Sequence, residues 1–359
     1  MSANEIIIMV MAGFALLGAV DRILGNKLGL GKEFEDGIQT MGSLALAMVG
    51  IICLAPVLAN LLKPVVVPVY TVLGADPAMF AGTILACDMG GGALAQELTN
   101  DSQAALLGGV LTGSMLGATI VFTIPVAMGI LEENDRPALA KGILAGIVTI
   151  PVGVFAGGLV AGFSVGMLFR NLIPVVLIGL LIALGLWRFE NAMIVGFGIF
   201  GKIIIAVITV GLAAAIVRGL TGFAIIPGMV PIEESFLTVG AIAIVLAGAF
   251  PLVYVLTKLL KKPLVKIGGL LGINSVAAAG LLASLANSIA TFGLVKDMDK
   301  RGKVVNIAFA VSAAFVFGDH LGFAAGFAPE ILPAMIVGKL VGGVSAIAVA
   351  MLLTRKESL

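Results

Sequence analysis

Charged side chains are scarce in this sequence. Only 11% of its 359 residues are Asp, Glu, Lys or Arg, whereas 60% are hydrophobic, and the mean hydropathy is +1.19. A soluble domain of this size does not need so much apolar surface, so the composition excludes soluble classes and predicts a polytopic α-helical membrane protein. The apolar runs are long and continuous, which excludes the short alternating segments of an outer-membrane β-barrel.

Other functional patterns are also missing. The two cysteines, Cys53 and Cys87, lie inside apolar runs, so we interpret them as core residues and expect neither a disulfide nor a metal site. No Gly-Lys pair is followed by Ser or Thr, as the phosphate-binding loop of an ATP-driven pump requires. The net charge of +1 and the lack of a basic cluster with aromatic residues give no indication of a nucleic-acid partner. We expect no cofactor.

Long apolar runs dominate the rest of the chain, and a bilayer-spanning helix needs about 20 residues. The polar stretches between them are all too short for a soluble domain. We therefore predict an all-α polytopic membrane protein of about 9–11 transmembrane helices, with residues 1–359 forming a single membrane-transport domain. The apolar runs are 5–21, 41–60, 78–96, 104–130, 139–163, 172–187, 194–217, 236–257, 267–294, 304–328 and 331–353.

The two halves of the chain resemble each other. Sixteen residues between positions 42 and 121 are identical to the residue 198 positions later, and Leu61-Leu62-Lys63 meets Leu259-Leu260-Lys261 in this register. Such internal repeats are common in secondary transporters. We predict repeat 1 at about 42–160 and repeat 2 at about 240–353.

The basic residues discriminate between two topologies. If every apolar run crosses the membrane, Lys and Arg divide almost equally between the two faces, which fits the positive-inside rule poorly. If 78–96 and 267–294 instead enter and return as hairpins, 17 of the 21 basic residues share one face and only Lys63, Arg170, Arg218 and Lys339 lie on the other. The hairpins also invert the second repeat relative to the first. The alternative is that 78–96 and 267–294 each cross the membrane once as ordinary helices.

Two aspartates, Asp88 and Asp319, lie deep in apolar runs, where a charged side chain costs a few kcal/mol. Asp88 precedes three consecutive glycines, and Asp319 precedes His320, the only histidine. An unpaired buried carboxylate favours a small cationic amine, Na⁺ or H⁺ as its partner. The alternatives are a helix-capping role for Asp88, a structural acid–imidazole pair at Asp319-His320, and a proton-sensitive His320, whose ordinary pKa is about 6.5.

The repeat register places Asn287 and Ser288 opposite the glycine-rich break that follows Asp88. An amide and a hydroxyl would there supplement the carboxylate, and backbone groups at the glycines could face a ligand. Few aromatic residues lie near this site, so we expect no aromatic cage. The candidate substrate-binding residues are Asp88, Gly90, Gly91, Asn287, Ser288, Ser312, Asp319 and His320.

Several runs in the sequence resemble the EutH-type ethanolamine permeases of bacterial ethanolamine-utilisation operons. They are Met41–Gly50, Phe80–Gly91, Leu144–Pro151, Phe309–Phe315 and Gly318–Ala325, and the resemblance covers nearly the whole chain. It implies uptake of ethanolamine across the bacterial cytoplasmic membrane by facilitated diffusion. It implies no residue-level site. Ethanolammonium carries one ammonium and one hydroxyl. A carboxylate suits the ammonium, and the neutral polar groups beside it suit the hydroxyl.

Three alternatives remain open. One is a Na⁺- or H⁺-coupled carrier of another small polar solute, with Asp88 or Asp319 as the coupling site. Another is an intramembrane aspartyl protease, in which the two aspartates would share a proton. A third, a membrane scaffold, leaves the buried acids unexplained. For the leading hypothesis we expect no enzymatic activity, a lipid bilayer as surroundings, an N-terminus outside and a cytoplasmic C-terminus. A homo-oligomer is left open.

Overall fold

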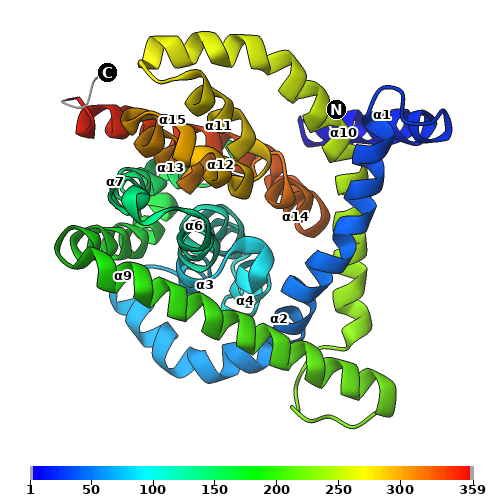
Figure 1. Cartoon of the computed structure of the whole chain (residues 1–359). Helices are drawn as coiled ribbons and strands as arrows, with labels where there is room; N and C mark the ends of the chain where they lie inside the picture. Colours follow the sequence, from blue (N-terminus) through cyan, green and yellow to red (C-terminus); the bar gives the residue numbers. More distant parts are fainter. Residues whose placement is uncertain (1–2, 356–359) are drawn as a thin grey trace.

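All regular structure is helical in the part of the chain that the computed structural model describes, which is residues 3–355 without the side chains at 3, 261, 262, 264, 265 and 267 (Figure 1). Lys261, Lys262 and Lys356, which enter the charge count, lie outside these described side chains. Seven of the described helices are long and apolar enough to cross a membrane. The predicted all-α polytopic membrane fold is confirmed. The seven are Asn4–Ile23, Leu30–Val72, Ser102–Ile130, Glu133–Val160, Val165–Thr221, Ile232–Leu260 and Pro329–Leu353.

Helix α9 (Val165–Thr221) is 57 residues long and consists of two segments. Its backbone leaves helical geometry at Phe189, where φ is −137° and ψ is 47°. A methyl group at Gly185 would lie only 2.7 Å from the Met193 sulfur, although eight residues of a straight helix would separate the two by about 12 Å. The helix therefore folds back at Phe189, as the separate predicted runs 172–187 and 194–217 require.

Two long helices with opposite directions, α2 (Leu30–Val72) and α10 (Ile232–Leu271), pack against each other at one side of the molecule. In Figure 1 the C-terminal part of α2 bends along the bottom, whereas that of α10 bends along the top. Prolines inside both helices account for such bends, because each removes a backbone hydrogen bond. Helix α1 (Ala3–Ile23) packs against both. The predicted apolar runs 41–60 and 236–257 are too short, because α2 already begins at Leu30 and α10 continues to Leu271.

The predicted run 78–96 is a hairpin of α3 (Met79–Ile84) and α4 (Gly92–Leu98), joined by a π-helical turn at Cys87–Gly91. Its two ends meet, because the Thr99 hydroxyl donates to the Asp76 carboxylate at 2.9 Å. In a continuous helix these residues would lie about 34 Å apart. The Asp76 amide also donates to the Asn171 side chain at 2.7 Å, which places the start of α9 at the same face.

The second hairpin is formed by α11 (Ser275–Ala286) and α12 (Ser288–Leu294). The Thr291 hydroxyl donates to the Gly280 carbonyl at 2.9 Å and lies 2.8 Å from the Ser284 hydroxyl, so α12 folds back on α11. The predicted start at 267 is wrong, because residues 267–271 still belong to α10. Both re-entrant segments are nevertheless present, and the alternative of two ordinary spans does not fit.

The hairpins place the basic polar stretches together on one face. Lys303 pairs with Asp135, which precedes α7 (Arg136–Ile147), and Arg301 donates to the Thr354 carbonyl at 3.4 Å beyond α15 (Leu332–Leu353). The capping residues of the two halves also correspond. Asp101 caps α5 (Ser102–Ala105), and its repeat partner Asp299 caps α13 (Lys300–Ala313). The exact repeat boundaries stay a prediction.

The remaining elements pack around the two hairpins and the long helices α2, α9 and α10. The run 104–130 begins with α5, continues through two π-helical segments, η2 (Leu106–Gly117) and η3 (Thr119–Thr123), and ends in α6 (Ile124–Ile130). Helix α8 (Ile150–Val160) follows α7 and packs closely on α15, with Gly153 and Gly157 facing Gly338. The prediction of one span at 304–328 is wrong. The chain breaks there between α13 and α14 (Asp319–Phe327). Short 3₁₀ turns occupy 133–135, 295–297 and 329–331.

Candidate functional site

Two of the helix breaks are held together by backbone hydrogen bonds. The Phe315 amide donates to the Ser284 carbonyl at 3.0 Å, and the Phe317 amide donates to the Leu285 carbonyl at 2.9 Å. Phe315 has a φ of 62°, a left-handed conformation that costs a non-glycine residue free energy. The break between α13 and α14 is thus fixed by the end of α11, and it places Asp319 and His320 at the start of α14.

A small buried cavity, the inner cavity, lies where this break faces the tip of the first hairpin. It measures about 30 Å³. Asp88 contributes a carboxylate from the π-helical turn, and Asp319 and His320 contribute side chains from α14. The structure therefore brings together three of the predicted site residues: Asp88 from the first half of the chain, and the adjacent Asp319 and His320 from the second half. The other lining residues are Ala86, Met89, Ala118, Phe122 and Phe315.

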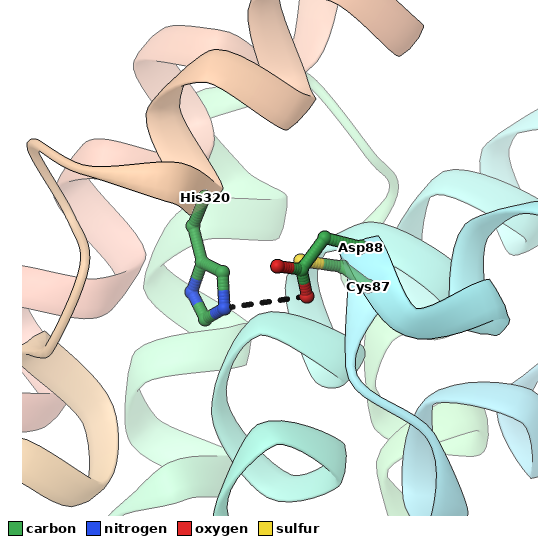
Figure 2. Close-up of side chains that lie close together, drawn as sticks. All are labelled: Cys87, Asp88 and His320. Atoms are coloured by element: carbon green, nitrogen blue, oxygen red, sulfur yellow. Dashed lines mark hydrogen bonds and ion pairs between the residues drawn. The ribbon is translucent and has the colours of Figure 1, made fainter. Parts of the chain in front are cut away.

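Figure 2 shows the His320 ring directed at the Asp88 carboxylate. The His320 Nε2 lies 3.7 Å from Asp88 Oδ1, too far for a good hydrogen bond but close enough for an ion pair if the ring is protonated. The ring is 3% exposed, and its Nδ1 has no hydrogen-bond partner among the described residues. A buried imidazole without a partner is uncommon, so this side chain has hydrogen-bonding capacity left for a ligand.

Aromatic rings form part of the wall. The Phe315 ring lies 5.2 Å from the His320 ring and 5.4 Å from Phe122, measured between centroids. The expectation that few aromatic residues lie near the site was wrong in this respect. Phe122 and Phe315 are distant in sequence, and the fold brings them to the same cavity as Asp88. A ring face attracts a cation, so these walls suit an ammonium group.

A buried cation lies near the inner cavity. Lys339, on α15, is 1% exposed, and its ammonium donates to the Ser114 carbonyl of η2 at 2.6 Å. Ser114 follows Gly113, which lies against the Cys87 backbone, so the ammonium lies near the turn that carries Asp88 without forming a direct ion pair. The charge count placed Lys339 at a membrane face, which is wrong. The neighbouring residues of Lys339 are apolar, and only the fold shows that the ammonium is directed inward to a backbone acceptor.

The remaining predicted site residues are distributed around the breaks. Gly90 and Gly91 are buried in the π-helical turn, where Gly90 has a φ of 96° and lies against Ile51. Ser288 and Ser312 are fully buried, and their hydroxyls have no hydrogen-bond partner among the described residues. None of these four lines the inner cavity, so their contact with a ligand stays a prediction.

A second, larger cavity, which we term the vestibule, lies between α2, α10, α11 and the start of α14 and measures about 280 Å³. Asn287 lines it, and its side-chain oxygen accepts a hydrogen bond from the Ile289 amide at 2.7 Å, capping α12. Asp319 lines both the vestibule and the inner cavity. The other lining residues are Glu33, Phe250, Val253, Tyr254, Thr257, Ala286, Phe317 and Gly318.

The inner cavity has one group of metal-ligating side chains. Ligand atoms of Cys87, Asp88 and His320 lie within 4.8 Å of one another. The Cys87 sulfur is 4.0 Å from Asp88 Oδ1. A closed zinc site uses four ligands, and this group within the described residues offers three. Among the described residues, the group therefore lacks the fourth side-chain ligand of a closed structural zinc centre.

Sequence comparison identifies the family of the chain. The model of a family described as "Ethanolamine utilisation protein, EutH" matches residues 3–353. The chain belongs to the EutH family. Three relatives cover almost the whole chain. A "Probable ethanolamine permease EutH" of Listeria monocytogenes is 61% identical over 356 residues, which are 99% of this chain and 95% of the relative.

Two further relatives come from other bacteria. A second "Probable ethanolamine permease EutH", from Salmonella typhimurium, is 51% identical and covers 99% of this chain and 97% of its own. A Bacillus subtilis protein named "Uncharacterized protein YxeR" is 52% identical over 100% of this chain and 97% of its own. No solved structure matches this chain. Two of these three relatives are named probable permeases, a class of transporter.

Four residues near the EutH cavities were not predicted from the sequence. Phe122 and Phe315 lie in apolar runs and carry no polar signal. Glu33 and Tyr254 lie in or near segments that resemble ordinary membrane boundaries. The repeat register could have indicated the importance of 313–318, because it aligns this break with the π-helical part of 104–130. Both are departures from regular α-helix at corresponding depth.

Proposed function

We propose that this EutH chain is a permease that carries ethanolamine across the bacterial cytoplasmic membrane by facilitated diffusion with alternating access. The relatives named probable ethanolamine permeases support the substrate. The multi-pass helical fold with two re-entrant hairpins supports a carrier, because transporters use such broken helices to form binding sites near the bilayer centre.

The observation that carries the proposal is a pair of carboxylates in one aromatic-walled cavity. Asp88 and Asp319 both line the inner cavity, and neither has a Lys or Arg side chain within ion-pair distance among the described residues. Two carboxylates in a low-dielectric site attract an ammonium strongly, and the nearby Lys339 ammonium is bound to the Ser114 carbonyl instead of to either of them. We propose that both hold the substrate ammonium and that the His320 ring binds the substrate hydroxyl.

The size of the inner cavity indicates a closed state. A volume of about 30 Å³ has room for roughly two or three water-sized groups, whereas ethanolammonium has four heavy atoms. The cavity must therefore widen to admit the substrate. The unwound residues 314–318 and 85–91 are suited to this movement, because they are the only links within their segments that lack continuous α-helical hydrogen bonding.

The orientation follows from the charges. We propose that the face that carries Arg22, Asp135, Arg301 and Lys303 is cytoplasmic, because cytoplasmic loops hold an excess of Lys and Arg. This orientation places the N-terminus outside and the C-terminus inside. It also makes the vestibule cytoplasmic, since Glu33 lies near the first turn of α2 on the same face as Arg22.

Uptake of labelled ethanolamine into proteoliposomes tests the proposal. Asp88→Asn keeps the shape of the side chain but removes its charge, so we expect uptake to fall at least tenfold while the protein still inserts. Asp36→Asn, on α2 outside both cavities, is the matched control. Normal uptake by Asp88→Asn would remove Asp88 from the site.

The same assay separates the alternatives. Facilitated diffusion requires no imposed Na⁺ or H⁺ gradient, whereas a coupled carrier depends on one. The inner cavity contains both aspartates of the aspartyl protease alternative, so cleavage of a membrane peptide by the purified protein is the control for that reaction. The names of the relatives favour transport over proteolysis.

A further inference from the structure

The vestibule has the composition of a cation site, separate from the inner cavity. Two carboxylates, Glu33 and Asp319, and three aromatic rings, Phe250, Tyr254 and Phe317, line its 280 Å³. Glu33 and Asp319 have no ion-pair partner among the described residues. This volume is large enough for ethanolammonium without widening.

An ammonium already lies on the aromatic wall. The Lys258 Nζ is 4.0 Å from the centroid of the Tyr254 ring, which is the geometry of a cation–π contact. The Tyr254 hydroxyl lies against Gly29, where φ is +82° and a side chain would collide with the ring, so the ring is held in place. The Tyr254 ring therefore already contacts a primary ammonium in this structure, supplied by the exposed Lys258 side chain.

We propose that the vestibule is a second binding site for the primary ammonium of the substrate, ahead of the inner cavity and distinct from it. Glu33 and Tyr254 hold the ammonium, and the Lys258 ammonium occupies the ring when the substrate is absent. Asp319 borders both cavities, so a cation can pass from one to the other without leaving a carboxylate. The inference rests on the proposed transport of ethanolamine for its ligand but not on the role of Asp88.

Equilibrium binding of labelled ethanolammonium to the purified full-length protein tests the second site. We expect two ligands per wild-type chain, one for Asp88→Asn and one for Glu33→Gln. Glu35→Gln is the matched control, because Glu35 lies two residues along α2, pairs with Arg22 and lines neither cavity. We expect it to bind two. Binding of as many ligands by Glu33→Gln as by the wild type would overturn the proposal.

The aromatic wall is tested in the Asp88→Asn background, where only the vestibule is left to bind. Tyr254→Leu is expected to weaken this binding about threefold to tenfold, and Tyr254→Phe to preserve it, because the ring face is the binding group. Lys258→Gln removes the competing ammonium of an exposed side chain and is expected to tighten binding. Unchanged affinity in both Tyr254→Leu and Lys258→Gln refutes the assignment.

The two proposals fail differently. If Asp88→Asn transports normally but Glu33→Gln binds one ligand fewer, the vestibule stands and the inner site does not. If Asp88→Asn abolishes uptake and Glu33→Gln changes neither binding nor the half-saturating concentration of uptake, the inner site stands and the vestibule does not.

Discussion

Gly117 sets the position of the first hairpin, and its substitution tests the architecture of the site. A methyl group at Gly117 would overlap the Leu85 carbonyl group and lie 2.9 Å from the Gly82 carbonyl oxygen. Both neighbours are backbone atoms, which cannot rotate away as a side chain can. Gly117→Ala must therefore push the hairpin away from η2, and Leu85 is only three residues before Asp88.

The size of the effect follows from this geometry. Overpacking against an unyielding backbone costs about 1–3 kcal/mol of stability. A shift of about 1 Å in a binding group can lower a rate on the order of 100-fold. We therefore expect Gly117→Ala to unfold more readily and to lose uptake about 100-fold. Thermal unfolding can be followed with a thiol-reactive fluorophore, because Cys53 and Cys87 are 0% and 1% exposed.

Two further glycines calibrate the result. A methyl at Gly113 would lie 3.0 Å from the Cys87 amide nitrogen, so Gly113→Ala should cause a smaller loss. Gly129, in α6, has no atom within 4 Å of the added methyl, and Gly129→Ala should retain wild-type uptake and stability. If Gly117→Ala behaves like Gly129→Ala, the hairpin does not lie against η2 and the site described above is incorrect.

Three other predictions concern stability and topology. Asp76→Ala removes the acceptor that joins the two ends of the first hairpin, and we expect a loss of about 1–3 kcal/mol in the same unfolding assay. Lys339→Met leaves the nearby Asp88 carboxylate without its buried cation, so adding Asp88→Asn should recover about 1–3 kcal/mol, whereas strictly additive effects would show that the two do not interact. In a cysteine-free background, Thr71→Cys and Asn100→Cys should react with a membrane-impermeant thiol reagent from the same side, and reaction from opposite sides excludes the hairpin.

The hairpins could be predicted because loop charge is a property of the sequence itself. The distribution of Lys and Arg favoured a return of the segments 78–96 and 267–294 to the side from which they enter, and the inversion of the repeat followed from these hairpins. Asp88 and Asp319 could be selected for the same reason, since a carboxylate in an apolar run is conspicuous without any knowledge of its neighbours.

The features that were missed depend on tertiary contacts. The break after Ala313 contains no proline, and backbone hydrogen bonds that it donates to the Ser284 and Leu285 carbonyls hold it open. The sequence around Phe315 is compatible with a continuous helix, and only packing against another segment selects the left-handed conformation. Lys339 was wrongly predicted at a membrane face because its partner is a backbone carbonyl. Every residue has such a carbonyl, so the sequence does not indicate which one a lysine will contact.

The inner cavity also has an electrical consequence. Its carboxylates stay with the protein, so a substrate that binds them as an ammonium takes one positive charge through the membrane in each cycle. One elementary charge moving through about 100 mV gains about 2.3 kcal/mol, which is a concentration ratio of roughly 50. If the chain carries ethanolammonium as proposed, a cell with a negative interior can accumulate the amine with no coupling ion, driven by the membrane potential alone.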